Sequence, residues 1–224
     1  MGLFLLASCE EEEYYYPSVK LEFVTVKAGN DGKIQLLIPD KGKQLQVSQD
    51  LTNSSITANG FKRVLSNYET LITPGGEDAS VKIYSLQSVL QLEPRLLDDP
   101  TFGGVMKNDP VDVMSIWIGG GYLNMILNLK VNGGKQHKLG AVEEKERSSV
   151  MNPAVNEVTL SLYHNANGDE EYYNRRAFVS IPLSKYDLDQ TIRVEFKYHT
   201  YNKKGEVVEA VKYCTYTPSA NRIN

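Results

Sequence analysis

Apolar and polar side chains alternate along residues 122–131, and this period of two predicts a β-strand there. Five apolar residues share one face of that strand: Leu123, Met125, Leu127, Leu129 and Val131. The opposite face carries Asn124, Asn128 and Lys130, with Ile126 as the exception. A strand that is apolar on one face must bury that face against a second layer, so this region is restricted to a layered β fold.

The same alternation recurs through residues 112–218. Further strands are expected around residues 115–118, 158–162, 178–181, 194–198 and 207–217. Clusters of turn-forming residues separate them, including Gly133-Gly134 and the hairpin loop at residues 202–205. Because one face of most of these strands is polar, residues 112–218 are predicted to form an antiparallel, Ig-like β-sandwich of two sheets.

Residues 19–93 are predicted to form five short strands, as in a small closed Greek-key barrel of the OB type. The strands are expected around residues 19–26, 34–38, 45–47, 60–73 and 81–86. In the first strand the apolar set changes phase at Val24, which predicts a β-bulge or a sharp bend. Residues 60–73 also fit helical spacing, but their bounding glycines and proline and their β-favouring residues favour a strand.

Residues 94–111 are rich in proline and glycine, so we expect a linker between the two β regions. Asp98 and Asp99 are adjacent within it, but neighbours on an extended chain point apart, and no base or metal partner is close in sequence. No catalysis is therefore assigned to this pair. The predicted fold class is all-β, with an N-terminal OB-like barrel followed by the β-sandwich.

A short apolar run at the N-terminus ends in a cysteine. Leu6, Ala7, Ser8 and Cys9 resemble the lipobox of bacterial lipoproteins, in which signal peptidase II cuts before the cysteine and the cysteine is acylated. The resemblance implies that residues 1–8 are a truncated lipoprotein signal and that the chain contacts a membrane through acylated Cys9. The implied location is the outer membrane of a Gram-negative bacterium, either surface-exposed or facing the periplasm.

Four adjacent carboxylates follow this cysteine, at Glu10, Glu11, Glu12 and Glu13. They repel one another and resist packing, so residues 9–18 are expected to be a solvated acidic tether. The block also resembles the export signal of surface lipoproteins in anaerobic Gram-negative bacteria of the gut and mouth, and we assign these glutamates to that role.

The charge balance of the remaining chain bears on its partners. The full sequence has 24 Lys and Arg against 28 Asp and Glu, so it is balanced once the four glutamates are set aside. Nucleic-acid binding depends on a basic surplus that releases counterions, and none is visible. Nucleic acid is therefore not expected as a partner.

No catalytic, metal or cofactor site is predicted. Residues 119–121 are three glycines that lack the spacing and following helix of a phosphate-binding loop, and residues 165–171 fit a hairpin turn better than a calcium loop. His137, His164 and His199 are far apart in sequence and lack zinc-ligand spacing, so each is expected at the surface. Cys214 is expected to be a buried small hydrophobe.

Two longer stretches carry a resemblance to a known family. Residues 117–124, Trp-Ile-Gly-Gly-Gly-Tyr-Leu-Asn, follow Asp-Pro-Val at 109–111, and residues 63–68 read Arg-Val-Leu-Ser-Asn-Tyr. Both resemble the NigD-like lipoproteins, which implies an OB domain and a C-terminal β-sandwich behind a lipobox. The resemblance implies no catalytic residues. The family takes its name from a bacteriocin-associated operon, which implies an immunity role. The family-motif surface is expected at Trp117, Gly119, Gly120, Gly121, Tyr122 and Asn124.

The sequence therefore predicts a non-enzymatic envelope protein that binds an unknown protein or glycan. A version of this hypothesis is bacteriocin immunity by sequestration of a toxin. The alternatives are a structural or assembly component of an outer-membrane complex and a glycan-binding surface lipoprotein, with an enzyme ranked third because no catalytic constellation is visible. The sequence leaves the oligomeric state open.

Overall fold

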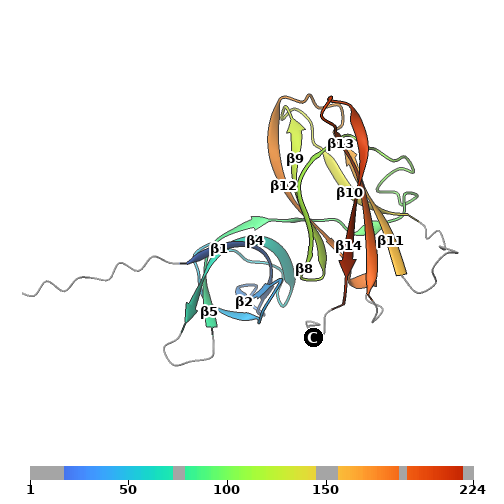
Figure 1. The fold of residues 1–224 in the computed structure, drawn as a ribbon. Helices are drawn as coiled ribbons and strands as arrows, with labels where there is room; N and C mark the ends of the chain where they lie inside the picture. The colour runs from blue at the N-terminus through green and yellow to red at the C-terminus, as the bar shows by residue number, and fades with distance from the viewer. Residues whose placement is uncertain (1–17, 73–78, 145–155, 187–190, 219–224) are drawn as a thin grey trace, which may run out of the picture.

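The computed structural model describes residues 18–72, 79–144, 156–186 and 191–218, which form a β-barrel followed by a β-sandwich (Figure 1). Cys9 and Glu10–Glu13 lie outside the described residues. Within those ranges, no helix has the length and apolar character needed to cross a bilayer.

Five strands close the barrel in the order β1-β2-β3-β5-β4. They are β1 (Val19–Ala28), β2 (Ile34–Pro39), β3 (Leu45–Asp50), β4 (Phe61–Ile72) and β5 (Ala79–Ser88). Val24, Val26 and Leu37 are fully buried in its centre. The predicted OB-like barrel is confirmed, and residues 61–72 form a strand that pairs antiparallel with both β1 and β5.

The β-bulge expected at Val24 is wrong, whereas the bend offered as its alternative stays a prediction. β1 shifts register against β2 further along, between Lys27 and Ala28. β1 and β4 keep one continuous register from Val19↔Glu69 to Lys27↔Phe61. The apolar phase changes because β1 is buried on both faces at its centre. Val24 packs into the barrel, whereas Phe23 belongs to a separate cluster that includes sandwich residues.

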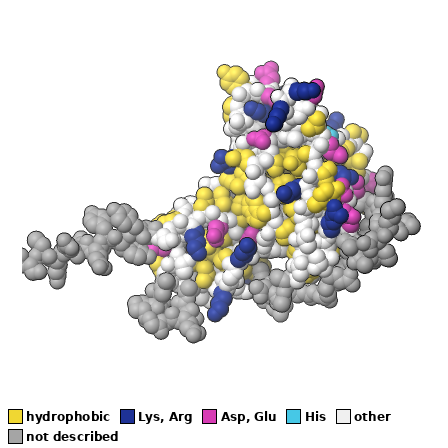
Figure 2. All heavy atoms as spheres, viewed as in Figure 1, with side chains coloured by type: hydrophobic (Ala, Val, Ile, Leu, Met, Phe, Trp, Pro, Cys, Tyr) yellow, Lys and Arg dark blue, Asp and Glu magenta, His cyan; other side chains and the backbone are white. Residues whose placement is uncertain are grey.

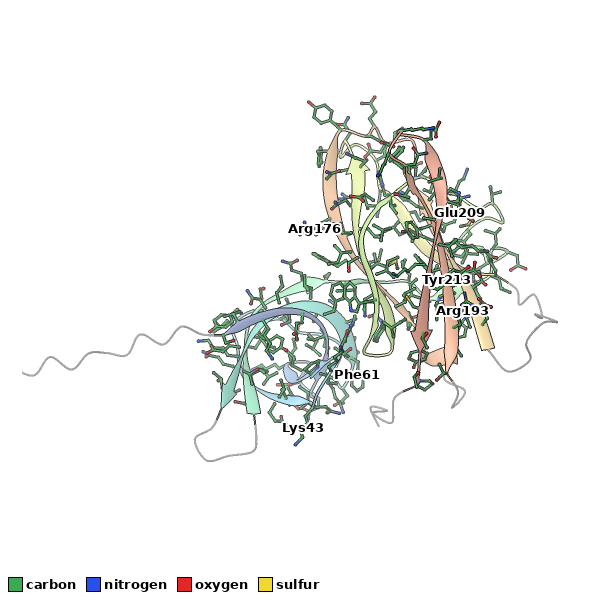
Figure 3. The ribbon with its side chains drawn as sticks, viewed as in Figure 1. Lys43, Phe61, Arg176, Arg193, Glu209 and Tyr213 are labelled. Carbon is green, nitrogen blue, oxygen red and sulfur yellow. The ribbon has the colours of Figure 1, made fainter. Side chains whose placement is uncertain are left out.

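Within the described ranges, nine strands build the sandwich. They are β6 (Leu90–Gln91), β7 (Pro94–Arg95), β8 (Asp112–Gly119), β9 (Tyr122–Val131), β10 (Lys138–Glu143), β11 (Asn156–Asn165), β12 (Tyr173–Pro182), β13 (Ile192–Tyr201) and β14 (Val207–Tyr216). One sheet has the order β14-β13-β11-β10-β7 and the other the order β6-β12-β9-β8. Figure 3 labels Arg176 from β12 of the second sheet, and Arg193 and Tyr213 from the first.

The sandwich core contains the apolar face of β9, the strand in which apolar and polar side chains alternate along the sequence. Leu123, Met125, Leu127 and Val131 are fully buried, and Phe196 from the other sheet joins them in one cluster. The predicted sandwich is therefore confirmed. Antiparallel pairing was expected throughout, but β11 and β13 run parallel, because the intervening β12 belongs to the opposite sheet.

Three short strands carry no alternation that sequence reasoning could detect. β6 and β7 have two residues each, and they pair in parallel with β12 and β10. β10 includes Gly140, Ala141 and Val142, which are buried in succession. β6 lies within residues 19–93, which are predicted to form the barrel, and β7 lies within residues 94–111, which are predicted to form a linker. Each of these strands instead adds to a sheet of the sandwich. The segment that connects the two domains is therefore attached to the second domain.

Candidate functional site

A cleft of about 780 Å³ lies between the barrel and the sandwich. The barrel contributes residues of β1, β4 and the β2–β3 turn, and the sandwich contributes residues of β8, β9 and β12. In Figure 2, hydrophobic side chains continue from the barrel onto the sandwich, with charged side chains around them. The volume is within the usual range for ligand pockets in proteins, and domain boundaries are a common place for them.

An aromatic cluster from both domains forms the apolar lining of this cleft. Phe23 of β1 meets Trp117 of β8 edge-to-face, with ring centroids 5.0 Å apart, and meets Phe178 of β12 at 5.9 Å. Leu65 and Ile126 pack into the same cluster. Edge-to-face contacts place the positive ring edge against the negative ring face, so the cluster stabilises the junction as well as lining the cleft.

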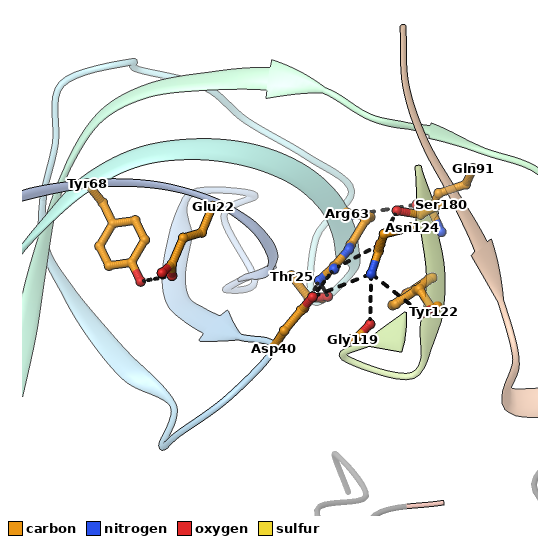
Figure 4. Close-up of polar contacts among 10 residues, drawn as sticks. All are labelled: Glu22, Thr25, Asp40, Arg63, Tyr68, Gln91, Gly119, Tyr122, Asn124 and Ser180. Carbon is orange, nitrogen blue, oxygen red and sulfur yellow. Dashed lines mark hydrogen bonds and ion pairs between the residues drawn. The ribbon is translucent and has the colours of Figure 1, made fainter. Parts of the chain in front are cut away.

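A buried arginine connects the two domains beside this cluster (Figure 4). The Arg63 side chain on β4 is 0% exposed, and its two terminal nitrogens lie 2.6 and 2.7 Å from the two carboxylate oxygens of Asp40. The same guanidinium donates to Asn124 Oδ1 of β9 at 3.1 Å and lies 4.8 Å from the centre of the Tyr122 ring. A planar guanidinium can make both a bidentate ion pair and a ring contact, which a lysine ammonium cannot reproduce.

Asn124 extends this network into the sandwich. It is fully buried, and its Oδ1 accepts a hydrogen bond of 2.7 Å from Ser180 on β12. Its Nδ2 donates to the Gly119 carbonyl at 3.1 Å. Burial of an amide is favourable only when its polar atoms are paired, and Asn124 meets that condition through partners in both domains.

The glycines of residues 119–121 make room for this network. Gly120 and Gly121 have φ of +59° and +81° and form the two-residue turn between β8 and β9. A Cβ atom on Gly119 or Gly120 would overlap the Asp40 carboxylate. These glycines therefore serve both a left-handed turn and the close approach of the barrel to the sandwich.

The cleft opens at the mouth of the barrel. Tyr68 donates a hydrogen bond of 2.7 Å to Glu22, and Lys20 lies over the Tyr68 ring. Burial, and then the hydrogen bond and charge of Glu22, raise the pKa of Tyr68, so this phenol stays protonated and remains a donor. The Glu22 and Asp40 carboxylates at this site already have partners.

The structure places the residues of the expected family-motif surface at this junction. Trp117 lines the cleft, Gly119, Gly120 and Asn124 surround the Asp40–Arg63 pair, Tyr122 contacts the arginine, and Gly121 completes the turn. Sequence reasoning included Arg63 in a family motif without assigning it to the site, and it missed Asp40 and Phe178. Their patterns are those of ordinary turn and strand residues, so no local signal identifies them.

A second cavity, of about 560 Å³, lies on the sandwich. Its lining includes Leu97, Met106, Glu144, Ser161 and Lys197. Glu144 accepts hydrogen bonds from Lys197 at 2.9 Å and from Ser161 at 2.8 Å. Glu144, Lys197 and Ser161 thus satisfy one another.

Two histidines expected at the surface are instead buried together at the sandwich. His164 is 2% exposed, its Nδ1 donates to the Asp109 carbonyl at 2.8 Å, and its Nε2 lies 2.9 Å from His137 Nδ1. His137 Nε2 lies 3.4 Å from an Asp169 carboxylate oxygen. Among the described residues, no group of three or more His, Cys, Asp or Glu side chains is arranged to hold a metal ion.

This pair predicts a loss of stability in weak acid. Burial, and secondarily the charge of His137, lower the pKa of His164, so the unfolded chain takes up a proton more readily than the folded chain. The stabilisation is present above the ordinary histidine pKa of about 6.5 and is lost as the pH falls below it, by at most about 1.4 kcal/mol per pH unit for one proton. Urea denaturation between pH 7.5 and 5 measures this loss.

The matched variants are His164→Gln and His199→Gln. The first removes the titrating group and is expected to flatten the pH dependence, whereas the second should keep the wild-type slope because His199 is only partly buried. Identical slopes for wild type and His164→Gln would contradict the assignment.

Comparison with known proteins agrees with this two-domain arrangement. The model of the NigD-like N-terminal OB domain matches residues 23–89, and that of the NigD-like C-terminal beta sandwich domain matches residues 95–212. The chain belongs to the NigD-like family. The comparison indicates no family of enzymes, and no match is found among curated proteins.

Solved structures extend the comparison. A NigD-like immunity protein from Bacteroides caccae is 54% identical over 92% of this NigD-like chain and 100% of its own, with a TM-score of 0.80. A protein from Parabacteroides distasonis, provisionally described as toxin-related, is 20% identical and covers 90% of this chain and 94% of its own, with a TM-score of 0.69. A protein from Bacteroides fragilis, provisionally described as a lipoprotein, is 12% identical over 92% and 100%, with a TM-score of 0.60. The last two show the shared fold alone.

Proposed function

We propose that this NigD-like protein is a lipid-anchored, non-enzymatic binding protein of the cell envelope that captures its ligand in the cleft between barrel and sandwich. The observation that carries the proposal is a cleft whose walls come from two domains held together by the buried Arg63–Asp40 pair. A ligand in such a cleft meets preorganised walls, which lowers the entropic cost of binding. Leu21 lines the cleft and is 62% exposed, so it provides apolar surface for a protein or glycan to bury.

The ligand proposed first is a bacteriocin, which the protein would sequester before it harms the cell. Support comes from the 54% identical relative from Bacteroides caccae, which is described as a NigD-like immunity protein. The balanced charge outside Glu10–Glu13 is compatible with a protein ligand, and the chain as a whole lacks the basic surplus that nucleic-acid binding uses.

Protection can be tested by deleting the gene and returning variants to the deletion strain. Deletion should raise sensitivity to bacteriocins of neighbouring strains, and the wild-type chain should restore resistance. Leu21→Asp places a charge in the cleft at a side chain that is already 62% exposed, so it should fold but fail to protect. Leu51→Asp is the matched control, since Leu51 is 46% exposed outside the cleft lining. A deletion strain no more sensitive than wild type would refute the immunity role.

Membrane attachment has a separate test. Cys9→Ser removes the proposed acylation site and should move the protein from the membrane to the soluble fraction, because acyl chains contribute about 0.8 kcal/mol per buried CH₂. Cys214→Ser is the control, since it changes the other cysteine of the chain, which lies in β14. Fractionation of cells followed by immunoblotting measures the effect. Equal membrane fractions for the two variants would show that Cys9 is not the anchor.

A second candidate function is docking to another envelope component, favoured by the outer edge of the sandwich. β14 is the edge strand of its sheet, and Val207, Val211 and Tyr213 on it are 48%, 40% and 50% exposed. Exposed apolar side chains on an edge strand are a frequent contact surface between proteins. Pull-down from native envelopes with Val211→Asp would test it, and an unchanged set of co-purified proteins would exclude docking at β14.

A further inference from the structure

The N-terminal half of β1 has an unpaired edge. β4 pairs with β1 from Val19 to Lys27, but β2 pairs with it only from Val24 to Ala28. Among the described residues, no strand or loop backbone bonds to the β2-side edge of residues 19–23. In an antiparallel ladder about half of the N–H and C=O groups point to each side, so this edge, about 17 Å long, can still accept a strand.

The free edge borders the cleft. Lys20, Leu21, Glu22 and Phe23 all line it, as do residues 39–43 at the end of β2 and in the turn that follows. The separation of β2 from β1 beyond Val24 therefore helps to open the cavity. A ligand in the cleft would lie beside backbone groups as well as side chains, which is a geometry that extended peptides use when they add to a sheet.

Basic side chains surround this position. Lys41, Lys43 and Arg176 line the cleft, and all three are exposed. Within the described ranges, none of them forms a salt bridge or a side-chain hydrogen bond, while the nearby carboxylates Glu22 and Asp40 are engaged by Tyr68 and Arg63. Arg63 offsets the charge of Asp40, whereas Tyr68 donates to Glu22 without neutralising it. The single charge of Glu22 is outnumbered by the four cations that line the cleft, Lys20, Lys41, Lys43 and Arg176, so the net charge there is positive and favours an anionic ligand.

The side chains of β1 indicate how an incoming strand would be patterned. Val19, Leu21 and Phe23 share one face, and Phe23 packs against the sandwich. Lys20 and Glu22 share the other face, at the barrel mouth beside Tyr68. Because neighbouring strands pair residues of the same face, an added strand would put apolar side chains next to Leu21 and Phe23 and its acidic side chains on the face of Lys20 and Glu22. Lys20 attracts these acidic side chains and Glu22 repels them, and the other cations of the cleft lining, Lys41, Lys43 and Arg176, make the sum attractive.

We propose that the cleft binds an extended acidic peptide segment of a partner protein, with alternating acidic and apolar side chains, which adds as a strand to the free edge of β1. The inference rests on the proposed cleft function and specifies its ligand class. An acidic glycan would use the same cations, but it has no regular array of N–H and C=O groups to pair with residues 19–23. The unpaired backbone edge therefore favours the peptide.

The test uses the full chain and a fluorescein-labelled peptide in which glutamate and valine alternate, with binding followed by fluorescence anisotropy. Binding is expected to weaken as salt is added, because exposed charges are screened. Those amides of residues 19–23 that face the free edge, and not β4, should exchange more slowly with deuterium in the complex, because the added strand pairs with them. A peptide with lysine in place of glutamate, and one with proline in place of valine, should each fail to bind, the first through charge and the second through lost N–H donors.

Two charge-reversed double variants separate the cleft from general electrostatics. Lys41→Glu with Lys43→Glu should weaken peptide binding about tenfold or more, since both side chains line the cleft. Lys203→Glu with Lys204→Glu changes the net charge equally, in the exposed hairpin between β13 and β14, and should leave affinity within about twofold. An equal loss in both double variants, or unchanged exchange at residues 19–23, would overturn strand addition.

Oligogalacturonate serves as the acidic glycan probe. If it binds and the glutamate–valine peptide does not, the cleft is an anion site for glycans and the peptide proposal is wrong. If neither probe binds while Leu21→Asp still abolishes protection in cells, the cleft function stands and only the ligand class fails. If the peptide binds through the cleft while Leu21→Asp still protects, the ligand class stands and the immunity role fails.

Discussion

Arg63→Ala is expected to lower the free energy of unfolding by about 3–5 kcal/mol, as is typical when one partner of a buried ion pair is removed. The side chain is 0% exposed, and Asp40 and Asn124 both depend on it for hydrogen bonds. Removal of the guanidinium takes hydrogen-bond donors away from two groups. One is the Asp40 carboxylate, which is only 16% exposed, and the other is the Asn124 amide, which is fully buried. Urea denaturation followed by tryptophan fluorescence is a direct measurement, because Trp117 is the only tryptophan and lies at the domain junction.

The control is another arginine in an ion pair, placed at the surface. Arg193 lies 3.6 Å from Glu157, and the two side chains are 49% and 36% exposed. Solvent screens such a pair, so Arg193→Ala should change stability by less than about 1 kcal/mol. Arg63→Lys keeps the positive charge and should recover part of the lost stability, but it cannot restore the bidentate pair or the planar contact with Tyr122. If the two alanine variants unfold at the same urea concentration, Arg63 does not hold the domains together.

Phe196→Ala is expected to lower the free energy of unfolding by about 3–5 kcal/mol through loss of buried apolar surface and the cavity it leaves. Phe196 on β13 is fully buried in the sandwich core, and its ring stacks on Tyr198 at a centroid distance of 6.1 Å. Thermal unfolding by calorimetry measures the loss.

Val211→Ala provides the matched comparison for this core substitution. Val211 lies on β14, the neighbouring strand of the same sheet, and is 40% exposed. Little apolar surface is lost there, so the stability of the variant should stay within about 0.5 kcal/mol of wild type. A Phe196→Ala chain as stable as Val211→Ala would contradict the position of Phe196 in the core.

The strands were predictable where burial is one-sided. Residues 123–131 show this best, since every second side chain enters the sandwich core and the alternation is written directly in the sequence. β10 was missed because Gly140, Ala141 and Val142 are buried in succession. The false bulge in β1 has the same origin, because both faces of that strand are covered around Val24. Alternation of apolar and polar residues appears in the sequence only when one face of a strand is exposed to water. Where both faces are buried, the alternation is absent and the strand or its register cannot be predicted from it.

The candidate site was predictable only in part. The family motif at residues 117–124 correctly indicated the residues that the sandwich contributes to the junction. Two of its glycines lie so close to the Asp40 carboxylate that a side chain there would overlap it. The histidine pair could not be foreseen, since His137 and His164 are 27 residues apart and meet only when β10 pairs with β11. Contacts of this kind depend on strand register across a sheet, for which short sequence spacing carries no signal.

By itself, the sequence determined the all-β class, the order of barrel and sandwich, the NigD-like family and the candidate acylation site at Cys9. These follow from local patterns: alternation, turn residues and short motifs. Only the tertiary structure decided that Arg63 joins Asn124 across the domain boundary and that the β1 edge at residues 19–23 opens into a basic cleft. The physical reason is that a cleft is made by surfaces far apart in the chain, whose charges and edges become a site only when two domains pack together.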